Sequence, residues 1–92
     1  MPYIKPDRRK DLAFKPRFTM KKPGELNYVI HQVIADYLQG GPSVNYEILS
    51  SVVGVLEDVK HEIQRRLMDP LENKKCNDNG DVEPYISIGK EL

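Results

Sequence analysis

Residues 25–38, ELNYVIHQVIADYL, decide the fold class of this chain. Their apolar side chains recur at intervals of three and four residues, which is the spacing of one face of an α-helix. Pro23-Gly24 precedes the stretch and Gly40-Gly41-Pro42 follows it, and both are typical of helix boundaries. The sequence therefore predicts a helix that starts at Glu25 and carries one buried apolar stripe, composed of Leu26, Val29, Ile30, Val33, Ile34, Tyr37 and Leu38.

A second, longer helix is predicted from about Tyr46 to about Met68, with Ser43 or Asn45 as its N-terminal cap. Ile48 and Val55 lie to one side of its apolar stripe and widen it. When an apolar stripe is too wide for one partner helix to cover, it indicates a second contact. We expect this second contact to be a subunit interface. The main stripe consists of Leu49, Val52, Leu56, Val59, Ile63 and Leu67.

Proline and turn residues predict the structure of the remaining segments. Four prolines within residues 1–23 predict an extended N-terminal arm. Asp69-Pro70-Leu71-Glu72 predicts the start of a short third helix that ends near Asn77. The alternation of apolar and polar residues from Val82 to Ile88 predicts a short extended segment after a turn.

These elements predict a mainly α fold: an antiparallel helical hairpin with a short third helix, an extended N-terminal arm and a short C-terminal extended segment. The length of 92 residues favours a single domain. Within it we distinguish a basic extended arm (residues 1–24), a helical hairpin body (25–78) and a turn with an extended tail (79–92).

The formal net charge of zero conceals a separation of charge along the chain. Residues 1–24 carry eight basic and two acidic side chains, whereas residues 25–92 carry six basic and twelve acidic ones. A domain that binds duplex nucleic acid is usually basic overall, because its affinity comes from neutralising phosphates. The acidic body therefore argues against a long nucleic acid, but a small anion is compatible with the basic arm.

Several classes of protein are excluded or disfavoured by the sequence. No apolar run approaches the roughly 20 residues of a membrane span, and the charged start is no signal peptide. The single Cys76 excludes an internal disulfide and, with only two histidines, the usual zinc spacings. No glycine-rich phosphate loop and no carboxylate pair in an apolar setting is present, so we expect no enzyme and no cofactor. Lys74 and Lys75 precede Cys76, and nearby cations lower the pKa of a thiol.

The basic arm is the main functional candidate. Arg8-Arg9-Lys10 and Lys21-Lys22 alternate with aromatic residues, which is the composition of a phosphate-binding surface with stacking groups. Two other interpretations remain open: these charges keep an acidic body soluble, or they pair with it across an oligomer. On the second helix, Lys60 lies about 40° from the centre of the apolar stripe, where a lysine either extends to solvent or reaches a specific anion.

The chain resembles a family of small, largely uncharacterised phage-encoded proteins. The resemblance covers nearly the whole chain, but Gln64 and Leu71 stand where that family has aromatic residues. It is carried by these motifs: Met1-Pro2-Tyr3-Ile4 followed by Arg8 or Arg9, Gly24-Glu25-Leu26-Asn27-Tyr28, Val53-Gly54-Val55-Leu56-Glu57, Arg65-Arg66, Pro70-Leu71-Glu72, Lys74-Lys75 and Asn79-Gly80-Asp81-Val82.

In size, helix pair and basic-plus-aromatic composition, the chain is also loosely similar to phage sponge proteins, which sequester cyclic nucleotide signals of bacterial immunity. This similarity implies an anti-defence sponge in the host cytoplasm, a homo-oligomer that binds a cyclic di- or trinucleotide without cleaving it. Arginine would clamp phosphate, tyrosine would stack on a base and asparagine would read a base edge or ribose. The predicted ligand-binding residues are Tyr3, Lys5, Arg8, Arg9, Asn27, Tyr28, Lys60 and Arg66.

Two alternatives belong to other classes of function. In the first, the protein is a small oligomeric interaction module whose basic arm docks on an acidic host or phage protein. In the second, it binds single-stranded nucleic acid, and its affinity falls steeply with salt.

Overall fold

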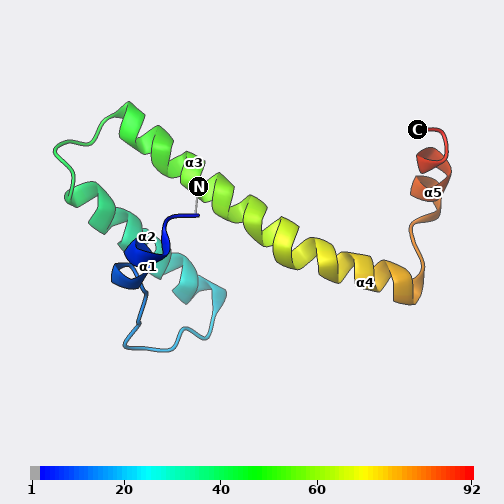
Figure 1. The fold of residues 1–92 in the computed structure, drawn as a ribbon, viewed down its shortest axis with the longest axis horizontal. Helices are drawn as coiled ribbons and strands as arrows, with labels where there is room; N and C mark the ends of the chain where they lie inside the picture. The colour runs from blue at the N-terminus through cyan, green and yellow to red at the C-terminus, as the bar shows by residue number, and fades with distance from the viewer. Residues whose placement is uncertain (1–2) are drawn as a thin grey trace. The chain divides into compact units, whose positions relative to one another are not determined.

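The computed structural model describes residues 3–92. The chain divides into two compact units, one ending at Val55 and the other starting at Leu56, and each is described separately. All regular elements among the described residues are helices, with no strand (Figure 1). The prediction of a mainly α fold is therefore confirmed.

The first unit begins with a short helix, α1 (Pro6–Asp11), inside the segment that we expected to be extended. That prediction is wrong for these six residues. Pro6 lies in the first turn, where backbone N–H groups have no carbonyl partner within the helix. Its lack of an N–H therefore costs no helical hydrogen bond. Asp7 in the first turn and Arg8 in the last turn have the charges that the helix dipole favours at each end.

Helix α2 (Pro23–Gln39) matches the prediction closely and begins two residues earlier than expected. Pro23 is accommodated at its first turn. The carboxylate of Glu25 accepts a hydrogen bond from the backbone N–H of Lys22 at 3.0 Å, which satisfies a donor that no helical carbonyl reaches. At the other end, the Gly40 N–H donates to the Asp36 carbonyl at 3.0 Å, and the helix stops at the predicted glycine.

Residues 40–45 reverse the chain direction, and α3 (Tyr46–Ile63) starts antiparallel to α2 (Figure 1). Of the two candidate caps, Asn45 is the one that acts. Its Oδ1 accepts a hydrogen bond from the Ile48 N–H at 2.9 Å, and its carbonyl accepts one from Leu49 at 3.0 Å. The start of α3 is thus set by an asparagine cap.

In the second unit, α3 continues without a break into a π-helical turn, η1 (Gln64–Met68), and then into α4 (Asp69–Asn79). The third helix is therefore present, but it has no separate cap, because Met68 has helical dihedral angles of −73° and −47°. Pro70 explains the widened turn: it lacks an N–H, and its ring conflicts with the carbonyl of Arg66, four residues earlier.

The C-terminal segment forms a helix, α5 (Glu83–Gly89), where an extended segment was predicted. An isolated strand needs a partner for its backbone groups, and the described part of the chain offers no strand. A helix supplies these bonds locally, as in the bond from the Ile86 N–H to the Val82 carbonyl at 3.2 Å. Gly80, with φ of +90°, turns the backbone between α4 and α5.

The apolar stripe of α2 is more exposed than the sequence predicts. No residue between positions 3 and 92 is buried, and the half-buried ones on α2 are Val29, Ile34, Ala35 and Leu38. Val33, in the middle of the predicted stripe, is 55% exposed. None of the helices in the described chain is long and apolar enough to cross a membrane.

Candidate functional site

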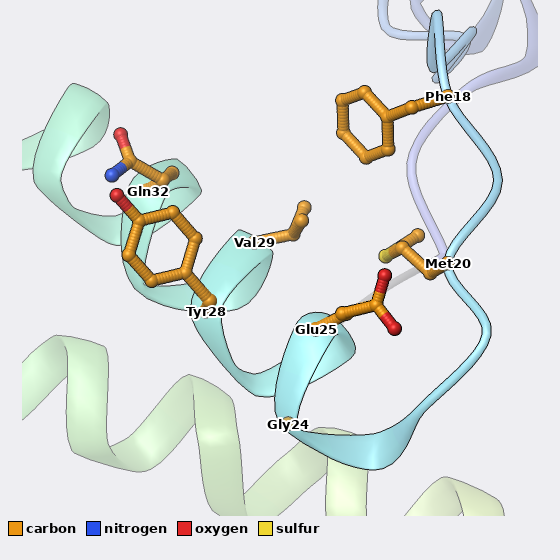
Figure 2. A pocket seen from close by; sticks show the side chains of 7 residues that line it. All are labelled: Phe18, Met20, Gly24, Glu25, Tyr28, Val29 and Gln32. Carbon is orange, nitrogen blue, oxygen red and sulfur yellow. The ribbon is translucent and has the colours of Figure 1, made fainter.

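An open groove of about 500 Å³ lies in the first unit, between the loop that follows α1 and the N-terminal half of α2 (Figure 2). Its volume falls in the range of about 300–1,000 Å³ that is usual for small-molecule sites. We call it the α2 groove. It is lined by Phe18, Met20, Gly24, Glu25, Tyr28, Val29 and Gln32.

The walls of the α2 groove come from two segments. Phe18 and Met20 extend from the loop, and Val29 of α2 points toward them (Figure 2). Tyr28 and Gln32 lie beside each other on α2, one turn apart along the helix (Figure 2). Phe18 is 55% exposed and Tyr28 is 65% exposed, so both aromatic rings are accessible to a planar ligand.

A second hollow of about 390 Å³ continues the α2 groove along the helix and shares Phe18, Val29 and Gln32 with it. Lys15 and Arg17 from the loop border this second hollow, and Asp36 of α2 lies at its far end. The two hollows therefore combine an apolar floor with a cationic edge. Phe14, Pro16 and Val33 complete the lining.

The two units differ in the sign of their charge. The first unit carries eight basic and five acidic residues, and all eight basic residues lie between Lys5 and Lys22. The second unit carries six basic and nine acidic residues. The positive charge of the first unit is thus concentrated on α1 and on the loop that forms one wall of the α2 groove, which favours an anionic ligand there.

Of the eight residues predicted from the sequence to bind a ligand, Tyr28 lines the α2 groove. Asn27 precedes it on α2, is exposed and takes no part in the lining. Lys60 on α3 and Arg66 in η1 belong to the second unit, so they are not part of this groove.

The other four predicted residues lie on or near α1. Arg8 pairs with Asp11 through Nη1 and Oδ2 at 3.5 Å. Arg9 donates a hydrogen bond from Nε to the Ile4 carbonyl at 2.7 Å, and Lys5 precedes the first residue of the helix. Tyr3 is 52% exposed. None of the four lines the α2 groove, and their role in binding stays a prediction.

The groove contains residues that the sequence did not single out as ligands. Lys15 and Arg17 alternate with Phe14 and Phe18 around Pro16, and this short pattern of cations and aromatic rings is the signal that marks the loop wall. Gln32 gives no such signal. Its helical position places it away from the apolar stripe, and it becomes a lining residue only because the loop lies against that side of α2.

Cys76 lies in a hollow of about 460 Å³ in the second unit, together with Asp81. Partial burial raises the pKa of this thiol, and the charge of Asp81 and the hydrogen bond that the thiol donates to its carboxylate raise the pKa further. Lys74 and Lys75 were expected to lower the pKa, and that expectation is wrong because the carboxylate of Asp81 is the charged group that acts on the sulfur. No cluster of three or more potential metal ligands occurs within residues 3–92.

Comparison with known proteins gives one match. Residues 1–82 match the model of a family described as "Domain of unknown function (DUF6899)". No curated protein and no solved structure matches the chain.

Proposed function

We propose a function for this chain, which belongs to the DUF6899 family, from the chemistry of its α2 groove. The protein binds a cyclic di- or trinucleotide and holds it without cleaving it. The observation that carries this proposal is the position of two exposed aromatic rings, Phe18 and Tyr28, in one groove beside a cationic loop.

The aromatic rings suit a nucleobase. Stacking of a base on an aromatic side chain contributes about 1–3 kcal/mol and accepts any base, because every base has a π face. Met20 and Val29 add apolar contacts around such a base. Gln32 and Glu25 place an amide and a carboxylate in the same groove, and these groups hydrogen-bond the edges of bases.

The loop suits the phosphates of the same ligand. Lys15 and Arg17 border the second hollow, and Lys21 and Lys22 follow on the segment that leads into α2. Arginine binds phosphate through two parallel hydrogen bonds, and lysine adds a point charge. A cyclic oligonucleotide carries bases and phosphates within a few ångströms of each other, which matches a groove with an aromatic wall and a cationic edge.

Sequestration follows from binding alone. A protein that holds a cyclic nucleotide lowers the free concentration of that signal without any chemical step. In a cell infected by a phage, this activity would prevent an immune signal from reaching its effector. The proposed biological role is therefore an anti-defence sponge in the host cytoplasm.

Isothermal titration calorimetry with a panel of cyclic di- and trinucleotides tests the proposal. We expect at least one member of the panel to bind at micromolar concentration or tighter. Heating the complex should release the nucleotide intact, as measured by mass spectrometry. Absence of binding across the panel contradicts the proposal, and release of a linear product contradicts sequestration without cleavage.

Two substitutions locate the binding site. Phe18→Ala and Tyr28→Ala should each weaken binding about fivefold or more, because each removes one stacking surface worth about 1–3 kcal/mol. Tyr46→Ala is the matched control, since Tyr46 lies in the same unit, is 87% exposed and takes no part in the groove. An equal loss in the control would mean that the groove is not the site.

A second candidate function is a protein-interaction module. It is favoured by the three consecutive basic residues Arg8, Arg9 and Lys10 on α1, all exposed and none of them in the α2 groove. Here the basic arm docks on an acidic host or phage protein. Arg8→Glu combined with Arg9→Glu should then abolish capture of a protein from host lysate. Loss of nucleotide binding by Phe18→Ala, with no effect of the arginine changes on protein capture, favours the sponge.

A further inference from the structure

We propose that Asn79 is a site of spontaneous deamidation, at which the side-chain amide is converted to a carboxylate. The site lies in the second unit, where Asn79 is the last residue of α4 and Gly80 follows it. The proposal is independent of the α2 groove and of the function proposed for that groove.

The reaction needs only these two residues and water. The backbone nitrogen of Gly80 attacks Cγ of Asn79, a new N–Cγ bond forms, and the amide nitrogen leaves as ammonia with the proton of the Gly80 N–H. Water then opens the cyclic imide. Cleavage of the new N–Cγ bond gives aspartate, whereas cleavage of the original peptide bond gives isoaspartate, in which the main chain runs through the side chain.

The glycine makes this asparagine the reactive one. Gly80 has no Cβ, so no side chain obstructs the approach of its nitrogen to Cγ of Asn79. Asn79 is exposed, so water and base reach its amide. The other asparagines of the chain precede tyrosine, lysine or aspartate, whose side chains obstruct the same approach. They are Asn27, Asn45, Asn73 and Asn77.

The position of Asn79 at the end of α4 leaves one backbone bond to be opened. Inside a helix the ring cannot close, because the next N–H is held by a carbonyl four residues earlier. The Gly80 N–H donates to the Cys76 carbonyl at 2.9 Å, and Gly80 itself has left the helical conformation, with φ of +90°. The Val82 N–H donates to the side chain of Asp81 at 2.7 Å and not to α4. Opening the bond to Cys76 therefore frees the peptide, and helix ends open readily.

A second polar contact holds the same turn. The thiol of Cys76 donates a hydrogen bond to the carboxylate of Asp81. Thiols are weak donors, so this contact adds little to the cost of opening the turn. The bond between the Gly80 N–H and the Cys76 carbonyl is therefore the main gate.

Asn73, in the middle of α4, is held more firmly than Asn79. Freeing the peptide bond that follows it breaks the helical hydrogen bonds of every residue from Lys74 to Gly80. Each bond of ordinary net strength that must open lowers the open fraction by about two- to tenfold. The structure thus favours reaction at the end of α4 over reaction in its interior, whatever residue follows the asparagine.

Deamidation changes the charge of the second unit. The new carboxylate lies at the C-terminal end of α4, beside Asp78, in the hollow that also holds Cys76 and Asp81. The helix dipole disfavours a negative charge at this end. The modification therefore weakens the last turn of α4, and the isoaspartate form also lengthens the connection to α5.

Ageing of the intact chain at mildly alkaline pH, followed by tryptic digestion and tandem mass spectrometry, tests the proposal. Trypsin cuts after Lys75 and Lys90, so Asn77 and Asn79 fall in one peptide and its fragment ions separate them. Relative to the unaged chain, we expect the mass gain of deamidation at Asn79, with an isoaspartate form that elutes separately, and none at Asn77. An unmodified Asn79, or equal modification at Asn77, overturns the proposal.

The rate in the folded chain, compared with the rate in urea that unfolds the chain, tests the gate. Because one backbone bond must open, Asn79 should react about two- to tenfold more slowly in the folded chain. Equal rates would show that the bond to Cys76 does not gate the reaction. A slowing far above this range would show that the whole of α4 must unfold, and either result overturns the gate at the helix end.

Lys74→Gly is the matched control, because it places the same dipeptide, an asparagine followed by a glycine, inside α4 at Asn73. In urea, Asn73 of this variant and Asn79 should react at similar rates. In the folded variant, Asn73 should react at least about tenfold more slowly than Asn79, because many more helical bonds must open. Equal rates at the two positions in the folded variant overturn the role of the helix end.

Discussion

The backbone N–H of Asp69 donates its hydrogen bond to the carbonyl of Gln64, five residues earlier, and not to a carbonyl four residues earlier. This bond closes the π-helical turn that joins α3 to α4. Pro70, the next residue, has no N–H to offer the carbonyl of Arg66. The wider turn therefore lets the helix pass through a proline without breaking.

Replacement of Pro70 by alanine should return this turn to α-helical geometry and stabilise the protein. Proline in a helix interior costs about 3 kcal/mol relative to alanine, and the π turn relieves part of that cost, so we expect a gain of about 1–3 kcal/mol. Urea unfolding followed by circular dichroism measures it, at one fixed protein concentration. Pro84→Ala is the control, since Pro84 lies in the first turn of α5 and should give little change. Equal gains from both variants would contradict this explanation.

Asn45 should contribute more to stability than Ser43, the other candidate cap of α3. Its side chain accepts the hydrogen bond of the Ile48 N–H at 2.9 Å. We expect Asn45→Ala to cost about 1 kcal/mol and Asn45→Asp to cost much less, because aspartate caps as well as asparagine. Ser43→Ala should be nearly neutral in the same unfolding measurement. A larger loss from Ser43→Ala would show that the cap is wrongly assigned.

Two glycines should respond to alanine with opposite signs. Gly54 lies in α3, and a Cβ built on it meets no atom within 4 Å, so Gly54→Ala should stabilise the protein by about 0.5–1 kcal/mol. Gly80 has φ of +90° and ψ of 152°, a region that side chains rarely adopt, so Gly80→Ala should destabilise it by about 1–3 kcal/mol. Thermal unfolding measures both. Destabilisation by Gly54→Ala would reveal another backbone packed against that side of α3.

The thiol of Cys76 should react slowly at neutral pH, because its pKa is raised above the ordinary value and only the thiolate is nucleophilic. The negative charge of Asp81 disfavours the thiolate, so Asp81→Asn should lower the pKa and speed alkylation at pH 8. Asp78→Asn, a nearby control, should leave the rate unchanged. The rate of iodoacetamide alkylation between pH 7 and 10 measures the pKa directly, since Cys76 is the single cysteine. A wild-type rate in Asp81→Asn would exclude the proposed contact.

The sequence predicted the long helices well, because their apolar residues repeat with the helical period over several turns. Helix α2 is the clearest case, from Pro23 to Gln39. The short helices α1 and α5 have too few residues to show a period, and their prolines pointed toward extended backbone. They form because proline is tolerated in a first turn and because local hydrogen bonds are the ones available to these segments.

The candidate site was harder to predict than the fold. The basic and aromatic residues of the arm were recognised as a binding composition, and Tyr28 was among the predicted ligands. The position of Phe18 against Val29 and Gln32 depends on how the loop folds back on α2, and no local pattern specifies it. For Cys76, proximity in sequence pointed to Lys74 and Lys75 as the charges that shift the pKa of the thiol. The turn at Gly80 instead brings the carboxylate of Asp81 to the sulfur.

The concentration of basic residues in the arm has a consequence for proteolysis. No lysine or arginine occurs between Pro23 and Val59, so a protease specific for basic residues finds no cleavage site in α2 or in the part of α3 that precedes Lys60. All of its targets in the first unit lie between Lys5 and Lys22. A single cut after Lys21 would separate the loop that carries Phe18 from the helix that carries Tyr28. One cleavage can thus remove a wall of the groove and leave the helices that flank residues 40–45 uncut.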